Sequence, residues 1–227
     1  MSAHGREIEF KFAVADKHGF RQLLEYLNLP AALLGSGVKQ INHFFDSETF
    51  CLRDHHHAIR LRQEAGRYRL TLKAEQLASP TTLLSDRAEQ EVELPNATAL
   101  ALLQGSVCPR HVIRHHFSNG SSTILQMVHS ACGDAPLVHI GEFTNERIYL
   151  PPVSIPIGKS AETVVFELDT STFPNGVVDH EFEIEISEDH DAPNLQAALI
   201  ELLKQAGIDW SSAPSKARRF FRALAAK

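Results

Sequence analysis

Short segments in which charged and apolar residues alternate recur along most of this 227-residue chain. The first is EIEFKF at positions 7–12, where Glu7, Glu9 and Lys11 alternate with three large apolar residues. Successive side chains of a β-strand point to opposite faces, so this pattern predicts a strand with one charged and one apolar face. Further segments of this kind are 41–47, 58–64, 67–75, 87–94, 112–118, 123–130, 144–151, 163–169 and 181–187. Many short strands and few helices predict a mainly antiparallel sheet, sandwich or closed barrel.

Helical spacing of apolar residues is confined to a few segments. Residues 16–29 and 96–105 have this spacing, the second with Asn96 as the expected N-cap. Residues 192–208, in which the helix is expected to stop at Gly207, and the basic segment 215–227 have it as well. No repeat or low-complexity linker divides the chain. The sequence therefore predicts a single domain over 1–227, with C-terminal helices at about 192–227 packing on the sheet.

The composition of the chain argues against some classes of binding partner. The net charge of −6 argues against a broad cationic surface for nucleic acid or anionic membranes. The cysteines Cys51, Cys108 and Cys132 are odd in number and widely spaced, which indicates neither a disulfide framework nor a thiolate zinc site. No leader or membrane span is visible. These features predict a cytoplasmic protein that binds neither nucleic acid nor membrane, and they leave a homodimer open.

Charge is unevenly distributed over the predicted strands. Carboxylates gather at 7–9, 89–91 and 181–185, whereas the charged faces of 58–62 and 69–73 carry only cations. The solvated faces of an ordinary antiparallel sheet are one interpretation of any single strand. Neighbouring carboxylates repel one another unless a cation lies between them, however. Segregation across strands favours a water-filled barrel with an acidic and a basic wall, which suits a complex of a metal ion with a polyphosphate.

With these residues in place, the chain resembles the CYTH superfamily, also called triphosphate tunnel metalloenzymes. The signature E-x-E-x-K is matched by Glu7, Glu9 and Lys11. Residues 44–73 resemble the FDT…LR…LRxR…LTLK segment, and RAEQE at 87–91 resembles R-x-E-x-E. TNER at 144–147 resembles N-x-R, residues 166–187 resemble LDxTxFxxGxxDYEIEIE, and PSKARRF at 214–220 resembles S-K-x-x-R-F. The resemblance spans nearly the whole chain.

The resemblance implies a closed, eight-stranded antiparallel β-tunnel with a charged lumen and flanking helices. It implies metal-dependent hydrolysis of a triphosphate with Mg²⁺ or Mn²⁺, foremost inorganic tripolyphosphate, with nucleoside and thiamine triphosphate as alternatives. The metal ligands that it implies are Glu7, Glu9, Glu183 and Glu185, followed by Glu181 and Asp169. The phosphate-binding residues that it implies are Lys11, Arg60, Arg62, Lys73, Arg87, Arg114 and Arg147. Glu89 and Glu91 would hold a second metal or orient the arginines, and Lys216 would close the tunnel.

One segment departs from the family pattern. IRHHF at 113–117 stands where K-x-R is usual, so Arg114 replaces the lysine and His116 the arginine. An imidazole binds phosphate less firmly than a guanidinium, which would weaken or pH-shift the activity. Two other functions stay open: an adenylyl cyclase that makes cyclic AMP from ATP, and a non-catalytic polyphosphate-binding module. The histidine run in DHHHAI at 54–59 is interpreted as a surface loop.

Overall fold

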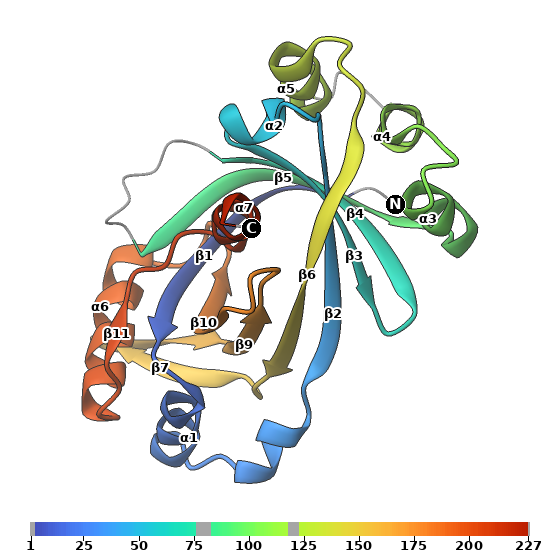
Figure 1. Cartoon of the computed structure of the whole chain (residues 1–227). Coiled ribbons are helices and arrows are strands. Elements are labelled where there is room, and N and C mark those ends of the chain that lie inside the picture. Colours follow the sequence, from blue (N-terminus) through green and yellow to red (C-terminus); the bar gives the residue numbers. More distant parts are fainter. Residues whose placement is uncertain (1–2, 76–82, 118–122, 227) are drawn as a thin grey trace.

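The computed structural model describes residues 3–75, 83–117 and 123–226 (Figure 1). Its strands are β1 (Ala3–Val14), β2 (Val38–Asp46), β3 (His57–Glu64), β4 (Arg67–Glu75), β5 (Leu84–Leu94), β6 (Val138–Tyr149), β7 (Val153–Ile157), β8 (Ser160–Val164), β9 (Glu167–Thr172), β10 (Val178–Ile186) and β11 (Trp210–Ser211). Its helices are α1 (Lys17–Tyr26), the 3-10 turn Ala31–Gly35, α2 (Cys51–Asp54), α3 (Asn96–Leu103), α4 (Pro109–Phe117), α5 (Thr123–Cys132), α6 (Ala192–Gln205) and α7 (Lys216–Ala225). Ser118 and Lys227, the last residues of two predicted segments, lie outside the described residues.

Eight of the strands close into an antiparallel barrel. They follow the order β10-β9-β6-β2-β3-β4-β5-β1, and β1 also pairs with β10, so the first and last strands meet. On one side of β1, Glu7 lies opposite Arg87 of β5, and on the other side Glu9 lies opposite Glu185 of β10. The prediction of a closed eight-stranded β-tunnel is confirmed. β11 adds a short pairing to the end of β1, and β7 and β8 form a separate hairpin.

The apolar face of β1 points outward, against helices. Ile8, Phe10 and Phe12 are buried in a cluster with residues of α1 and α6. Burying each such side chain stabilises the fold by about 1.5–3 kcal/mol. The side chain of Asp16 caps α1, accepting a hydrogen bond from the backbone N–H of His18 at 2.7 Å. Alternation along β1 therefore leaves its charged residues on the inner face of the barrel.

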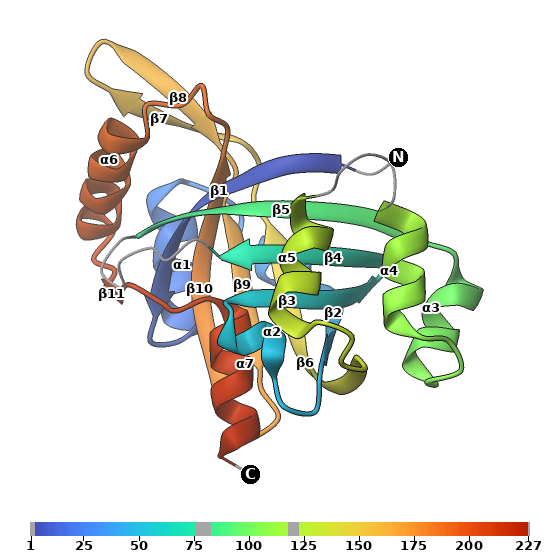
Figure 2. The same cartoon turned by 90° about the horizontal axis from the view of Figure 1, so that it is seen from above.

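The helices α2, α3, α4 and α5 contribute buried residues to a second apolar cluster, on the outer face of β3, β4 and β5. In this cluster α3, α4 and α5 lie on the side of the barrel away from α6 (Figure 2). The prediction of strands at 112–118 and 123–130 is wrong, because these segments form α4 and α5. The buried residues Ile113 and Phe117 are four apart, and Val128 and Cys132 are also four apart, which is helical spacing. None of the helices in the described ranges combines the length and apolarity needed to cross a bilayer.

Two boundaries differ from the sequence expectation. The expected strand at 163–169 is interrupted, since β8 ends at Val164 and β9 begins at Glu167. The helix α3 begins at Asn96, so Pro95 occupies the N-cap position and no side chain caps the helix. Both differences lie outside the inner face of the barrel strands that carry most of the predicted site residues.

The last helix lies across one opening of the barrel (Figure 1). Phe220 and Phe221 of α7 pack with Phe44, Phe143 and Phe173 in an aromatic cluster. The rings of Phe44 and Phe220 stack with centroids 4.6 Å apart. This packing places the basic face of α7 toward the charged lumen.

A disulfide joins Cys51 of α2 to Cys132 of α5, with Cα atoms 5.4 Å apart. The expectation of no disulfide is therefore wrong, because the fold brings together two cysteines that are 81 residues apart in sequence. Cys108 is free and exposed. Disulfides persist in oxidising compartments, so the cysteine argument for a reducing cytoplasm loses its support.

Reducing this disulfide is expected to lower the free energy of unfolding by about 2–4 kcal/mol, because the bond closes a long loop in the unfolded chain. Urea unfolding with and without a reductant measures the difference. The same experiment on Cys108→Ser, which keeps the bond, should give the same difference. Three free thiols in the denatured, unreduced protein would contradict the assignment.

Candidate functional site

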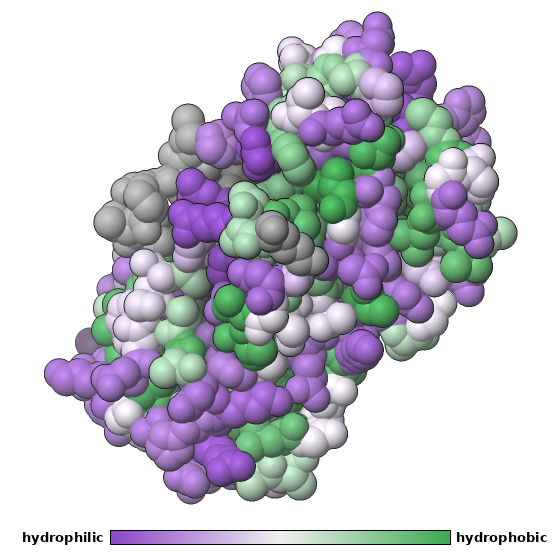
Figure 3. Space-filling view, in the orientation of Figure 1, coloured by the Kyte–Doolittle hydropathy of each residue, from purple (hydrophilic) through white to green (hydrophobic). Residues whose placement is uncertain are grey.

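The inner faces of the barrel strands line a cavity of about 650 Å³. Within the described part of the chain, eleven Lys or Arg side chains and seven glutamates line it. The predicted site residues among them are Glu7, Glu9, Lys11, Arg60, Arg62, Lys73, Arg87, Glu89, Glu91, Arg147, Glu183, Glu185 and Lys216. The excess of cations suits a polyanion, and the volume is within the usual range for small-molecule sites. The face that carries α7 mixes strongly hydrophilic with apolar side chains (Figure 3).

The acidic wall of the cavity lies on β1 and β10. Glu9 and Glu185 are direct cross-strand partners, a placement in which like charges repel. Glu185 forms no ion pair among the described residues. Its partial burial and the charges of Glu7 and Glu9 raise its pKa, although the charge of Lys73 opposes this shift. Because Glu9 pairs with Lys11 and Arg87, Glu185 is the carboxylate of the two whose charge is left unbalanced.

Two cations, Lys73 of β4 and Arg87 of β5, pair with the carboxylates of β1 and β5. Lys73 Nζ lies 2.8 Å from Glu7 Oε2 and 2.7 Å from Glu89 Oε2. Arg87 bonds to Glu7 at 2.5 Å and also to Glu9. Burial alone would raise the pKa of Glu7, but Lys73 and Arg87 outweigh it and hold this pKa well below its usual range. These contacts show how two like charges share the face of β1.

The partners of Glu91 are two side chains of the neighbouring strand β4. It accepts hydrogen bonds from Arg69 Nη1 and from Thr71 Oγ1, each at 3.1 Å. Glu91 thus fixes the position of an arginine at the edge of the cavity.

A second acidic cluster lies under α7. Asp169, Glu181 and Glu183 are buried, and each offers an oxygen within 4.8 Å of the others. Lys216 at the start of α7 reaches into it, with Nζ 2.7 Å from Asp169 Oδ2 and 2.8 Å from Glu183 Oε1, and it also pairs with Glu181. Burial would lower the pKa of Lys216, but these carboxylates raise it. Asp169 and Glu181 do not line the cavity itself.

Arg147 of β6 connects this cluster to the cavity. Its Nε donates to Asp169 Oδ1 at 2.8 Å, and its other nitrogens pair with Glu183 and Glu167. Lys216 also pairs with Asp169 and Glu183, whereas Glu167 shares Arg147 with both of them. Burial and the charge of Glu183 outweigh Arg147 and raise the pKa of Glu167 to about 7.

This raised pKa makes stability depend on pH. From pH 4.5, the ordinary pKa, to about 7, folded Glu167 holds a proton that the unfolded chain has lost, so its contribution to stability falls as pH rises. Between pH 5 and 8 the wild type is expected to lose on the order of 2 kcal/mol relative to Glu167→Gln. Urea unfolding at each pH measures this. Parallel curves for the two proteins would contradict the shift.

The basic wall on β3 faces the lumen without carboxylate partners. Arg62 Nε donates to Asn42 Oδ1 at 3.1 Å, and Arg60 Nη2 to Thr71 Oγ1 at 3.4 Å. Neither arginine has a carboxylate at ion-pair distance in the described ranges, and Arg60 Nε is buried without a partner there. Burial, followed by the charges of Arg60 and Arg147, lowers the pKa of Arg62 to about 10. This wall therefore lacks the anion that would balance it.

Arg114 and His116 lie away from the cavity. Both are on α4, outside the barrel, where Arg114 is exposed and His116 half-buried. The K-x-R alignment rested on the strand expected at 112–118, and the helix removes that basis. His116 therefore gives no reason to expect a weaker or pH-shifted activity.

Several lining residues escaped the sequence prediction of the site. Glu167 shares the inner face of β9 with Asp169, and that alternation could have identified it. Arg53, His56 and His57 line the cavity, so the segment 54–59 is not only a surface loop. The position of Arg53 depends on Asp46, whose carboxylate accepts hydrogen bonds from the N–H groups of Leu52 and Arg53 at 2.8 and 3.0 Å.

These observations define a β-tunnel whose lumen combines an acidic wall with an unpaired basic wall. The chain belongs to the CYTH domain family, whose model matches residues 5–221. The fold is similar to that of HpAC1 from Hippeastrum, described as a putative adenylyl cyclase with a dominant triphosphatase activity (TM-score 0.72, 23% identity, 95% of each chain). It is also similar to a putative adenylate cyclase from Bacillus halodurans (TM-score 0.60, 25% identity, 96% of this chain and 99% of that one).

One relative is similar in sequence over a shorter stretch. It is the Bacillus subtilis (strain 168) protein named "Putative triphosphatase YjbK", 39% identical over 67 residues. The match covers 30% of this chain and 33% of that protein, so it spans about a third of the relative's length.

Proposed function

We propose that this protein is a metal-dependent triphosphatase that hydrolyses a small triphosphate in its tunnel, foremost inorganic tripolyphosphate. One observation carries the proposal: Arg60 and Arg62 face the lumen without carboxylate partners, opposite an acidic wall in which Glu185 forms no ion pair with the described residues. A triphosphate bound to a divalent cation supplies both missing charges. The barrel and the helices at 192–226 would act together as one domain.

The carboxylates of the acidic wall fit a hard divalent cation. Glu7, Glu9, Glu183 and Glu185 would hold Mg²⁺ or Mn²⁺, since both ions bind carboxylate oxygens and Glu185, opposite Glu9, has negative charge to neutralise. When bound, such an ion polarises phosphoryl oxygens and lowers the pKa of a coordinated water. Asp169 and Glu181 lie next to Glu183 and would be further ligands. Glu89 would orient Lys73 or hold a second ion.

The cations would hold the phosphates. Arg60 and Arg62 are two residues apart on β3, so their side chains share one face of the strand. Each would bind non-bridging phosphate oxygens through paired N–H groups. Lys11, Lys73, Arg87 and Arg147 surround the same space and would add charge. Phosphoryl transfer depends mainly on positioning and on stabilising charge as it develops on the transferred group, which a fixed array of guanidinium groups provides.

One aromatic pair of the lining has no room for a nucleotide base. Phe44 and Phe143 line the cavity, but their rings stack on each other with centroids 5.9 Å apart, which leaves no gap for a base between them. Base recognition by a sandwich of these two rings is therefore blocked in this conformation.

The deciding experiment measures products. The protein is incubated with tripolyphosphate, ATP or thiamine triphosphate, each with Mg²⁺, Mn²⁺ or EDTA, and orthophosphate and cyclic AMP are quantified. The proposal expects metal-dependent orthophosphate release, fastest from tripolyphosphate. Cyclic AMP from ATP would instead identify the cyclase reaction, and tight tripolyphosphate binding without turnover would identify a binding module.

A further inference from the structure

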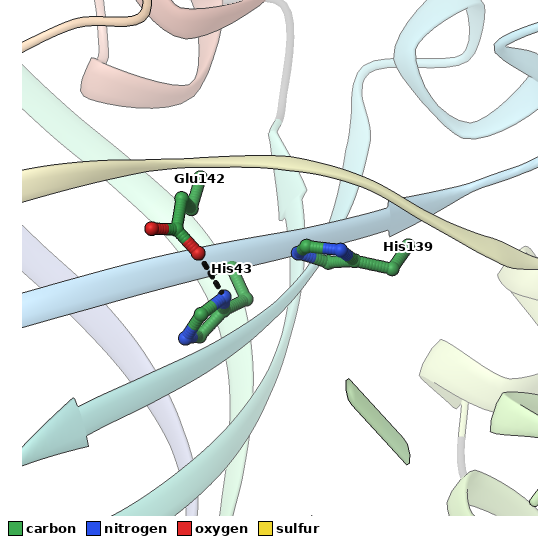
Figure 4. Close-up of side chains that lie close together, drawn as sticks. All are labelled: His43, His139 and Glu142. Carbon is green, nitrogen blue, oxygen red and sulfur yellow. Dashed lines mark ion pairs between the residues drawn. The ribbon is translucent and has the colours of Figure 1, made fainter. Parts of the chain in front are cut away.

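Two histidines and a glutamate gather on the outer face of the barrel, where β2 pairs with β6 (Figure 4). His43, His139 and Glu142 each offer a ligand atom within 4.8 Å of the other two. Nδ1 of His43 lies 2.8 Å from Oε2 of Glu142, and the ring of His139 points toward both. None of the three lines the cavity.

A β-bulge brings the three side chains to one face. Phe44 pairs with Gly141 and Phe45 with His139, so Ile140 is the extra residue on β6. Residues three apart on a regular strand point to opposite faces, but the extra residue places His139 and Glu142 on the same one. Gly141 has φ +136°, a conformation that other residues rarely adopt. The backbone is thus shaped so that the three groups converge.

The ring of His43 is buried, and its polar contact within the described residues is the one with Glu142. The residue is 6% exposed. Apart from the contact between Nδ1 and Glu142, the ring nitrogens of His43 have no polar partner within the described residues. Leaving a buried ring nitrogen without a hydrogen-bond partner is destabilising. Burial lowers the pKa of His43 and of His139 despite the charge of Glu142.

We propose that His43, His139 and Glu142 form a site for a zinc-type divalent transition metal. Two imidazoles and one carboxylate are a ligand set that binds Zn²⁺ tetrahedrally, with the fourth position left for water. Glu142 and His139 are exposed, so that position opens to solvent. Imidazole ligands select Zn²⁺ over Mg²⁺, so this site differs in metal from the all-carboxylate wall inside the tunnel. The inference does not depend on the proposed function.

The test is a calorimetric titration of the full chain with Zn²⁺ in excess Mg²⁺, which occupies hard oxygen sites. His139→Ala and Glu142→Gln remove ligands at exposed positions, so both variants should fold as the wild type does. His18→Ala removes an exposed histidine of α1 and is the matched control. We expect one high-affinity Zn²⁺ equivalent in the wild type and in His18→Ala. In the other two variants its affinity should fall by at least about tenfold.

Cobalt gives an independent readout. Co²⁺ in a tetrahedral site of this kind should produce visible d–d absorption in the wild type and in His18→Ala, and this absorption should be lost in His139→Ala. Absence of a saturable Zn²⁺ equivalent in the wild type would overturn the site. So would unchanged affinity in both ligand variants, or an equal loss in His18→Ala.

Discussion

Replacing Arg60 or Arg62 with alanine is expected to lower kcat/KM for tripolyphosphate by about 10²–10³-fold, because each removes a donor aimed at phosphoryl oxygens. The free energy of unfolding should stay the same or rise slightly. The Arg62 side chain makes no ion pair with the described residues, and its lowered pKa reflects the cost of burying its charge. Steady-state phosphate release and urea unfolding measure the two effects.

Arg114→Ala is the matched control for this pair. The same side chain is removed, but from the exposed face of α4, so phosphate release should stay within about twofold of the wild type. A large loss in Arg114→Ala, or full activity in Arg60→Ala and Arg62→Ala, would contradict the location of the phosphate site on β3.

Glu9→Gln is expected to reduce metal-dependent turnover by at least about 10²-fold while the fold persists. The substitution removes one of two facing carboxylates, and Glu183 and Glu7 still accept from Lys11 and Arg87. Phosphate release across a Mg²⁺ titration measures the loss, and circular dichroism checks the fold.

Glu93→Gln is the control for charge alone. Glu93 is an exposed residue of β5 that does not line the cavity, so this variant should behave as the wild type. If Glu9→Gln only became more stable and kept its activity, the carboxylates of β1 would be structural.

Period-2 alternation predicted most of the barrel, because each strand must bury one face against helices while the other faces the lumen. It failed at α4 and α5, where short apolar runs such as Val112 and Ile113 fit either period. The disulfide was not predictable either. Cys51 and Cys132 meet only because α2 and α5 pack over the same end of the barrel.

The candidate site was predictable where residues share a strand, and less so where strands meet. The acids and bases of β1, β3, β4 and β10 follow directly from alternation. The Glu9–Glu185 pairing depends on register, and the contact of Lys216 with Asp169 depends on how α7 docks. The His43 cluster depends on a bulge that no periodic pattern reveals.

Phosphate release from tripolyphosphate, followed through one cycle of chelation, tests the central claim most directly. With Mg²⁺ or Mn²⁺ present, the account predicts steady release of orthophosphate that stops when EDTA is added and resumes when excess metal is restored. No release with either ion, or release that continues unchanged in EDTA, would contradict a metal-dependent triphosphatase in this tunnel.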